Sequence, residues 1–181
     1  YVSAKYRDEG IKAYKGIINI SGGTVVATGG IGGAGIGIGY AGGADGAFTG
    51  GDINITGGTV EASGGIGAAG IGSGFVFYTY TTSSTCGNIS ITGGQATATG
   101  GDGGENTSNS FGVGSSFSEP FYGGAGIGTG SSIYTNYEGA SNCGTITIGN
   151  GVTRVTATKG GGTRPASNSI GKTVCYHSRS T

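Results

Sequence analysis

The chain has 181 residues, of which 46 are glycine and two are proline. Glycine follows no strict three-residue period, which excludes a collagen triple helix. Nine basic and nine acidic side chains give a formal net charge of zero, so the overall charge indicates no nucleic-acid partner. No apolar run approaches the roughly 18–20 residues of a membrane-spanning helix, and membrane insertion is not expected.

Composition also indicates where the protein acts. The chain has three cysteines, no methionine and no tryptophan, and it is rich in threonine, serine, asparagine and tyrosine. This usage is typical of an exported surface protein, so we expect an extracellular or cell-surface location. The chain begins at Tyr1 and carries no signal peptide, so we expect a mature or trimmed chain.

A repeated phrase organises the chain, which is the signature of a repeat architecture. A half-copy, EGIKAYKG, spans 9–16 and leads into the first full unit, IINISGGTVVATGG, at 17–30. The unit returns as DINITGGTVEASGG at 52–65 and as NISITGGQATATGG at 88–101, and a degenerate copy, two residues longer in its middle, covers 145–161. Each copy is followed by a phrase that joins glycine to isoleucine, and these isoleucines are Ile36, Ile71, Ile127 and Ile170.

Apolar and polar residues alternate within each unit, which predicts two β-strands per copy. Stacking equivalent positions puts isoleucine, valine and alanine columns inside and mainly polar columns outside. The inward columns are Ile18, Ile53, Ile89 and Ile146; Ile20, Ile55, Ile91 and Ile148; Val25, Val60, Ala96 and Val155; and Ala27, Ala62, Ala98 and Ala157. The outward columns are Asn19, Asn54, Ser90 and Thr147; Val26, Glu61, Thr97 and Thr156; and Thr28, Ser63, Thr99 and Thr158. Glycine pairs supply the corners, and the isoleucine of each glycine-isoleucine phrase fills the core from a third, thin wall.

The predicted fold is one all-β domain, a parallel β-solenoid of about four coils over residues 1–181. Its core is narrow, so small residues fill it and the high glycine content is tolerated. Long glycine- and aromatic-rich loops are expected on one side, because the connections that follow the third wall leave the same corner. The expected divisions are an N-terminal half-coil or cap at 1–16, coils near 17–51, 52–87, 88–144 and 145–181, and an insertion at 102–122.

Two stretches resemble bacterial sequence families. NISGGTVVATGGIGGAGIG, at 19–37, resembles the glycine-rich GAGIG repeats of secreted and cell-surface proteins from gut and soil bacteria. GIKAYKGIINISGG, at 10–23, is similar to bacterial carbohydrate-binding β-helix domains. The resemblance implies a right-handed parallel β-helix with an adhesive or polysaccharide-binding role. Such domains can hold calcium on acidic positions, but the acidic residues here form no ladder, so we assign no metal ligand: Asp45, Asp52, Glu61 and Asp102 are scattered.

No constellation of residues indicates catalysis. Parallel β-helix lyases and hydrolases need clustered carboxylates or a base beside them. Glu61 is the only acidic residue that faces outward from a predicted strand, and Asp102 and Glu105 share one loop. The sole histidine, His177, lies in the C-terminal segment, where we expect a solvated tail. The sequence therefore predicts a protein without enzymatic activity and without a cofactor.

Two cysteines occupy equivalent places in the repeat. Cys86 and Cys143 each stand three residues before the first isoleucine of a coil. Equivalent positions of adjacent strands lie about 4.8 Å apart, which is inside the Cα window for a disulfide. We expect these two residues to be stacked, either as a disulfide or as two reduced side chains that fill a corner. Cys175 is expected to begin the same corner of a further coil, as a competing partner or a free thiol.

The aromatic residues avoid the paired strand units and fall in the connections and termini. Aromatic rings stack on sugar faces, and loops on rigid scaffolds commonly bind ligands. One interpretation is therefore a face that binds polysaccharide or a cell-surface glycan. The alternative is that the rings pack on one another to order glycine-rich loops. The candidate ligand-binding residues are Phe77, Tyr78, Tyr80, Tyr122, Tyr134 and Tyr137.

Two other functions fit the repeat. A purely structural segment, such as a stalk, a spacer or a self-assembling subunit, would associate end to end or belong to a longer parent repeat protein, because solenoid ends expose unpaired edges. Ice binding through the outward threonine and serine columns is a minor alternative, and Glu61 in the middle of the row argues against it. The leading prediction is a non-catalytic extracellular adhesive module that binds polysaccharide.

Overall fold

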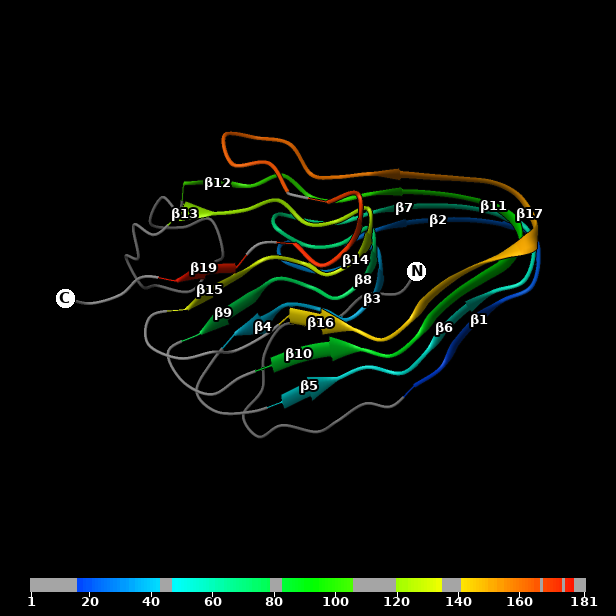
Figure 1. The fold of residues 1–181 in the computed structure, drawn as a ribbon, viewed down its shortest axis with the longest axis horizontal. Coiled ribbons are helices and arrows are strands. Elements are labelled where there is room, and N and C mark those ends of the chain that lie inside the picture. Colours follow the sequence, from blue (N-terminus) through cyan, green and yellow to red (C-terminus); the bar gives the residue numbers. More distant parts are fainter. Residues whose placement is uncertain are drawn as a thin grey trace.

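The computed structural model describes residues 16–42, 47–78, 83–105, 120–134, 141–166, 168–173 and 175–177. Every regular element in these ranges is a β-strand, and the strand pairs are parallel except for one short antiparallel pair. Strands from distant parts of the chain lie side by side, and Figure 1 shows the chain following the same curved path repeatedly. The prediction of an all-β fold with mainly parallel strands is therefore confirmed.

The largest sheet, which we name the long sheet, has six strands. Its first half contains β1 (Ile18–Ile20), β6 (Ile53–Ile55) and the N-terminal parts of β11 (Ile89–Thr99) and β17 (Ile146–Thr158). Its second half contains β2 (Thr24–Thr28), β7 (Thr59–Ser63) and the C-terminal parts of β11 and β17. The two long strands run through the bend at which the earlier parts of the chain break into two strands each.

Three smaller parallel sheets continue the path. The Ile-Gly sheet contains β3 (Ile36–Gly37), β8 (Ile71–Gly72), β14 (Ile127–Gly128) and β18 (Ile170–Gly171). The β9 sheet contains β4 (Ala41–Gly42), β9 (Val76–Tyr78), β15 (Ser132–Tyr134) and β19 (Cys175–His177). The β10 sheet contains β5 (Ala47–Thr49), β10 (Ser83–Cys86) and β16 (Ser141–Cys143). The antiparallel pair, β12 (Gly104–Glu105) and β13 (Pro120–Phe121), lies in the predicted insertion.

The chain visits these sheets in a fixed order: long sheet, Ile-Gly sheet, β9 sheet and β10 sheet. We name one such traverse a pass, and successive passes begin at β1, β6, β11 and β17. The register of the long sheet matches the predicted columns, since Ile18 pairs with Ile53, Ile53 with Ile89, and Ile89 with Ile146. Equivalent residues of successive passes are therefore direct neighbours.

The two extra residues in the last copy of the repeat are accommodated as irregular pairing. Register shifts between β11 and β17 occur between Ile91 and Gly93 and again between Gly94 and Gln95. Extra residues on one strand of a pair bend that strand and leave the ladder intact on both sides. The columns consequently resume in register beyond the bend, where Ala96 pairs with Val155.

The main core lies between the long sheet and the Ile-Gly sheet. Its residues in the middle passes are at most 1 % exposed, and they include Ile53, Ile55, Val60, Ala62, Ile71, Ile89, Ile91, Ala96, Ala98 and Ile127. Most of their equivalents in the first and last passes are only partly buried and pack against this cluster, namely Ile18, Ile20, Val25, Ala27, Ile146, Val155 and Ala157, whereas Ile36 of the first pass is 1 % exposed. The core is thus closed in the middle of the stack and open toward both ends.

Glycine is required after each isoleucine of the Ile-Gly sheet. The φ angles of Gly37, Gly72 and Gly128 are +138°, +137° and +135°, a region that residues with a Cβ rarely adopt. A Cβ on Gly72 would also collide with the carbonyl oxygen of Gly128 in the next strand. Positive φ and close backbone approach therefore explain why glycine recurs at this position of the repeat.

The β9 and β10 sheets differ from the sequence-based expectation, which treated these segments as loops. Some of their columns change between apolar and polar residues: Val76 pairs with Ser132, and Phe48 with Ser84. Such columns carry no repeated apolar alternation, although their backbones still pair in register. A tail is likewise expected at His177, but the backbone of this residue belongs to β19 and pairs with Tyr134 of β15.

Substitution of Gly72 by alanine tests the glycine column. We expect Gly72→Ala to lower the free energy of unfolding by about 2–4 kcal/mol, because it adds backbone strain and a backbone clash. Gly30→Ala is the matched control, since a Cβ there meets nothing within 4 Å and Gly30 has no positive φ; its effect should stay within about 1 kcal/mol. Chemical denaturation followed by circular dichroism measures both, and equal losses would contradict the assignment.

The isoleucine column gives a second comparison. Ile71 is fully buried, whereas Ile170, two strands along the same column, is 44 % exposed. Ile71→Ala should cost about 2–5 kcal/mol, as expected for a cavity in a packed core. Ile170→Ala should cost less than half as much by the same denaturation measurement. A larger loss at Ile170 would show that the last pass is buried.

Candidate functional site

Four of the described connection aromatics, Tyr40, Phe75, Phe77 and Phe121, form a second core, while Phe48 packs separately against Ala41 and Val76. Phe75 is fully buried and stacks on Tyr40, with ring centroids 6.1 Å apart and an interplanar angle of 13°. Phe121 meets the other side of Phe75 at 5.7 Å and 68°, an edge-to-face contact. Ile133 is buried in this cluster, and Phe77 packs against it while partly buried. For these residues the rings order the connections by packing on one another.

The base of the insertion is tied to the last pass by polar contacts. Asp102 accepts a hydrogen bond from the Gly161 N–H at 2.7 Å, and Glu105 accepts one from Arg164 Nε at 3.1 Å. The hydrogen bond to Glu105 raises the pKa of the Arg164 guanidinium, and a hydrogen bond with Tyr122 adds to the effect. Asp102 and Glu105 therefore do not pair with each other, and the candidate residue Tyr122 lies half-buried beside Arg164.

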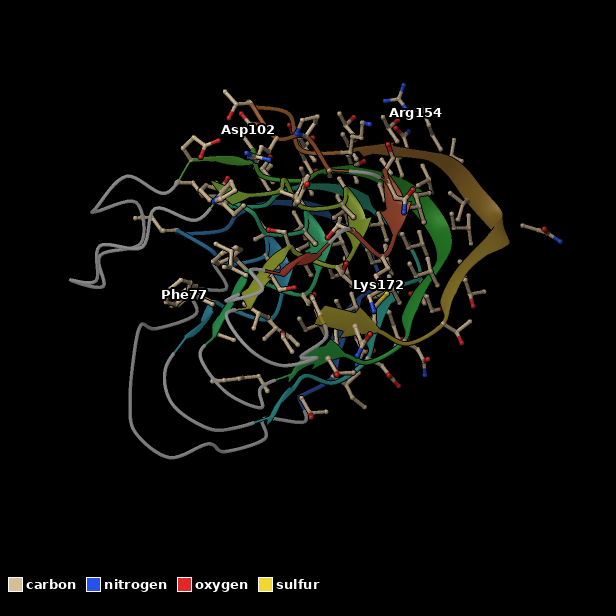
Figure 2. The ribbon with its side chains drawn as sticks, turned by 60° about the vertical axis from the view of Figure 1, so that its left-hand side comes forward. Phe77, Asp102, Arg154 and Lys172 are labelled. Carbon is tan, nitrogen blue, oxygen red and sulfur yellow. The ribbon has the colours of Figure 1, made fainter. Side chains whose placement is uncertain are left out.

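Two candidate tyrosines share a register position in the β9 sheet. Tyr78 is the last residue of β9 and pairs with Tyr134, the last residue of β15, which pairs in turn with His177. Each of these strands ends where the chain leaves the sheet. The candidates Tyr80 and Tyr137 lie outside the described residues. The structure thus brings two of the six candidate positions into one row, on the side of the molecule where Phe77 lies in Figure 2.

The two repeat cysteines are register partners, as expected. Cys86 ends β10 and pairs with Cys143, which ends β16. Both carry free thiols; Cys86 is 1 % exposed and Cys143 is half-buried. The expectation for Cys175 is wrong, because this residue lies in the β9 sheet opposite Ser132 and not in the cysteine column. The Cys175 segment directly follows the Ile-Gly phrase, as β9 and β15 do, and it therefore joins the β9 sheet, one sheet earlier in the path than the cysteine column.

Side-chain oxygen atoms of Asp52 and Asn88 at the corners bind backbone N–H groups of the next pass. Asp52 accepts a hydrogen bond from the Asn88 N–H at 2.7 Å, and Asn88 Oδ1 accepts one from the Thr145 N–H at 2.9 Å. Outside the corners, Glu61 stays exposed in the row with Thr97. Within the described ranges, no group of three or more His, Cys, Asp or Glu side chains could hold a metal ion.

The outward row of the long sheet has the predicted register. Val26 pairs with Glu61, Glu61 with Thr97, and Thr97 with Thr156. Val26 is 68 % exposed, so an apolar and a charged side chain interrupt the row of threonines. Ice binding through this face stays a prediction.

Two features were missed by sequence reasoning. A cavity of about 310 Å³ opens beside the first pass and is lined mainly by apolar side chains, among them Ile17, Ile18, Ile38, Phe48, Ile53 and Cys86. Buried hydroxyls gather between the β9 and β10 sheets, where Ser73 and Ser141 hydrogen-bond at 2.8 Å. Neither could be found in the sequence, because both depend on which sheets face each other.

Comparison with protein-family models, curated proteins and solved structures finds no match to this chain. The described residues contain no helix of the length and hydropathy needed to cross a membrane. Function must therefore be argued from the geometry given above.

Proposed function

We propose that the chain is a right-handed parallel β-helix of about four coils and acts as a non-catalytic, extracellular surface module that binds polysaccharide. The constant order of sheets in each pass supports the coil, because a chain that returns to the same sheets in parallel register advances by one strand per turn. The resemblance to GAGIG-repeat surface proteins and carbohydrate-binding β-helix domains supports the location and the role.

The observation that carries the binding proposal is the shared register of Tyr78 and Tyr134. Neighbouring parallel strands lie about 4.8 Å apart, so side chains at one register position repeat at that interval. A polysaccharide also repeats along its length and offers the apolar faces of its sugar rings for stacking. Two tyrosine positions in one register, at the ends of neighbouring strands, fit such a polymer, and Tyr80 and Tyr137 follow shortly after in the sequence.

Binding to a panel of neutral and acidic polysaccharides tests this proposal, by affinity electrophoresis and then by calorimetry on any ligand found. We expect the double variant Tyr78→Ala/Tyr134→Ala to lose about fivefold or more in affinity, because each stacked ring contributes roughly 0.5–1.5 kcal/mol. The matched variant Tyr78→Phe/Tyr134→Phe keeps both rings and should bind within about threefold of the original protein.

Circular dichroism must show unchanged β-structure in both double variants. If the double alanine variant still binds polysaccharide, the binding site does not lie at Tyr78 and Tyr134. Absence of binding by the unmodified protein across the whole panel would refute the polysaccharide proposal.

A structural, self-assembling repeat is the second candidate function, and the open ends of the stack favour it. Ile17 and Ile31 are 61 % and 58 % exposed in the first pass, and Ile148 and Ile170 are 46 % and 44 % exposed in the last. One edge of β17, a strand of 13 residues, also pairs with no strand among the described residues. A contact between the last pass of one copy and the first pass of the next is head-to-tail and does not close, so it produces filaments.

A substitution in the last pass distinguishes self-assembly from polysaccharide binding as the function of the chain. In sedimentation velocity, a self-assembling chain should form larger species as its concentration rises, and Ile148→Lys should raise the concentration needed at least tenfold by placing a charge in the apolar contact. Thr59→Lys adds the same charge at an exposed position of a middle pass and should leave association unchanged. A protein that stays monomeric at every concentration would rule out assembly.

A further inference from the structure

The cysteine column has the geometry of a dithiol pair. Cys86 and Cys143 are direct register partners in adjacent parallel strands, so their Cα atoms lie about 4.8 Å apart, within the range that a disulfide spans. In the preceding strand this position falls on Gly50, whose N–H donates to the Thr85 carbonyl. The column therefore holds these two cysteines side by side. Gly50, the neighbour of Cys86 on its other side, carries no sulfur.

The two thiols differ in access to solvent. Cys86 is 1 % exposed and belongs to the main core, whereas Cys143 is half-buried at the edge of that core. A reagent in solution therefore meets Cys143 more readily than Cys86, although Cys86 also lines the cavity beside the first pass. This asymmetry is that of an attacking and a resolving thiol.

The surroundings also separate the two thiols electrostatically. The pKa of Cys143 is lowered to about 7, chiefly because the Cys86 thiol donates a hydrogen bond to the Cys143 sulfur; burial opposes this effect, and the charge of Lys172 adds to it. The same hydrogen bond, together with burial, raises the pKa of Cys86. Lys172 Nζ is held near by its hydrogen bond to Asn142 Oδ1 at 3.3 Å, and Figure 2 shows Lys172 beside the gold strand β16. Lys172 is the charged group that acts on Cys143 in the described structure.

We infer that Cys143 and Cys86 form a reversible dithiol–disulfide couple, in which Cys143 attacks small-molecule disulfides and Cys86 resolves the product. The Cys143 thiolate attacks one sulfur of a disulfide RSSR, a mixed disulfide forms on Cys143, and RS⁻ leaves and takes up a proton. Cys86 then gives up its proton and attacks the Cys143 sulfur, the Cys86–Cys143 bond forms, and the second RS⁻ leaves as RSH. In sum, two protein thiols are oxidised and one RSSR is reduced to two RSH.

The surroundings of Cys143 favour a Cys86–Cys143 disulfide that is readily reduced by thiol–disulfide exchange. Stabilising the thiolate of Cys143 stabilises the reduced pair, and a couple whose reduced form is stabilised gives a more oxidising disulfide. When formed, the bond joins β10 to β16 and so connects two passes covalently. This inference does not depend on polysaccharide binding.

The first experiment measures the reactivity of Cys143 against pH in a Cys175→Ser background, which removes the third thiol. We expect the iodoacetamide reaction, mapped to Cys143 by mass spectrometry, to have its midpoint near pH 7 and to fall away as pH decreases. Lys172→Met should shift the midpoint upward and slow the reaction at pH 7 about threefold or more, whereas Lys172→Arg and the distant Lys159→Met should not. A midpoint near 8.5, the ordinary thiol value, would overturn the inference.

The second experiment follows the exchange itself with glutathione disulfide as the probe. The unmodified pair should yield the Cys86–Cys143 disulfide, detected by non-reducing peptide mapping, and dithiothreitol should reverse it. Cys86→Ala should stop at glutathione bound to Cys143, because no resolving thiol is present. Glutathione that stays on Cys143 when Cys86 is present would overturn the resolving role, and no reaction at either residue would overturn the couple.

Discussion

Parallel, in-register hydrogen bonding between successive passes is the constraint on which the other features depend. It places each side chain directly beside the side chain of the same position one strand away, as Ile53 lies beside Ile18 and Ile89. Each position of the repeat therefore favours residue types that pack well beside the equivalent residue of the adjacent strand, which is often of the same type. Apolar side chains meet this condition in the core, glycine meets it where backbones nearly touch, and two cysteines meet it as a potential bond.

The same constraint explains why stability is uneven along the stack. A middle pass is covered on both sides, so Ile71 and Ile127 are fully buried. A terminal pass is covered on one side, so Ile148 keeps nearly half of its surface exposed although its register partner Ile91 is fully buried. Local opening is expected to start where fewest apolar contacts must be broken. The last pass adds cross-links that offset this, through Asp102 to Gly161 and Glu105 to Arg164.

Sequence reasoning located the columns of the long sheet and the Ile-Gly sheet because the repeated phrase preserves residue type there. It also placed Cys86 beside Cys143, since both stand at the same distance from a column isoleucine. It missed the β9 and β10 sheets, where Val76 pairs with Ser132 and Phe48 with Ser84, so that the apolar columns of the other sheets do not continue there. It could not find Lys172 near Cys143 either, because that contact joins residues about 30 positions apart through the packing of different sheets. Strands that pair only through backbone hydrogen bonds need no repeated residue pattern, so the sequence does not reveal their pairing.

The direction of the hydrogen bonds has a mechanical consequence. Bonds between passes point along the direction in which the passes stack, so a pulling force between β1 and β17 loads one row of bonds at a time. Such a molecule lengthens stepwise, by the contour of one pass at each rupture. A bond between Cys86 and Cys143 would withhold the 56 residues that follow Cys86 from this extension, making the reach of the chain dependent on its redox state.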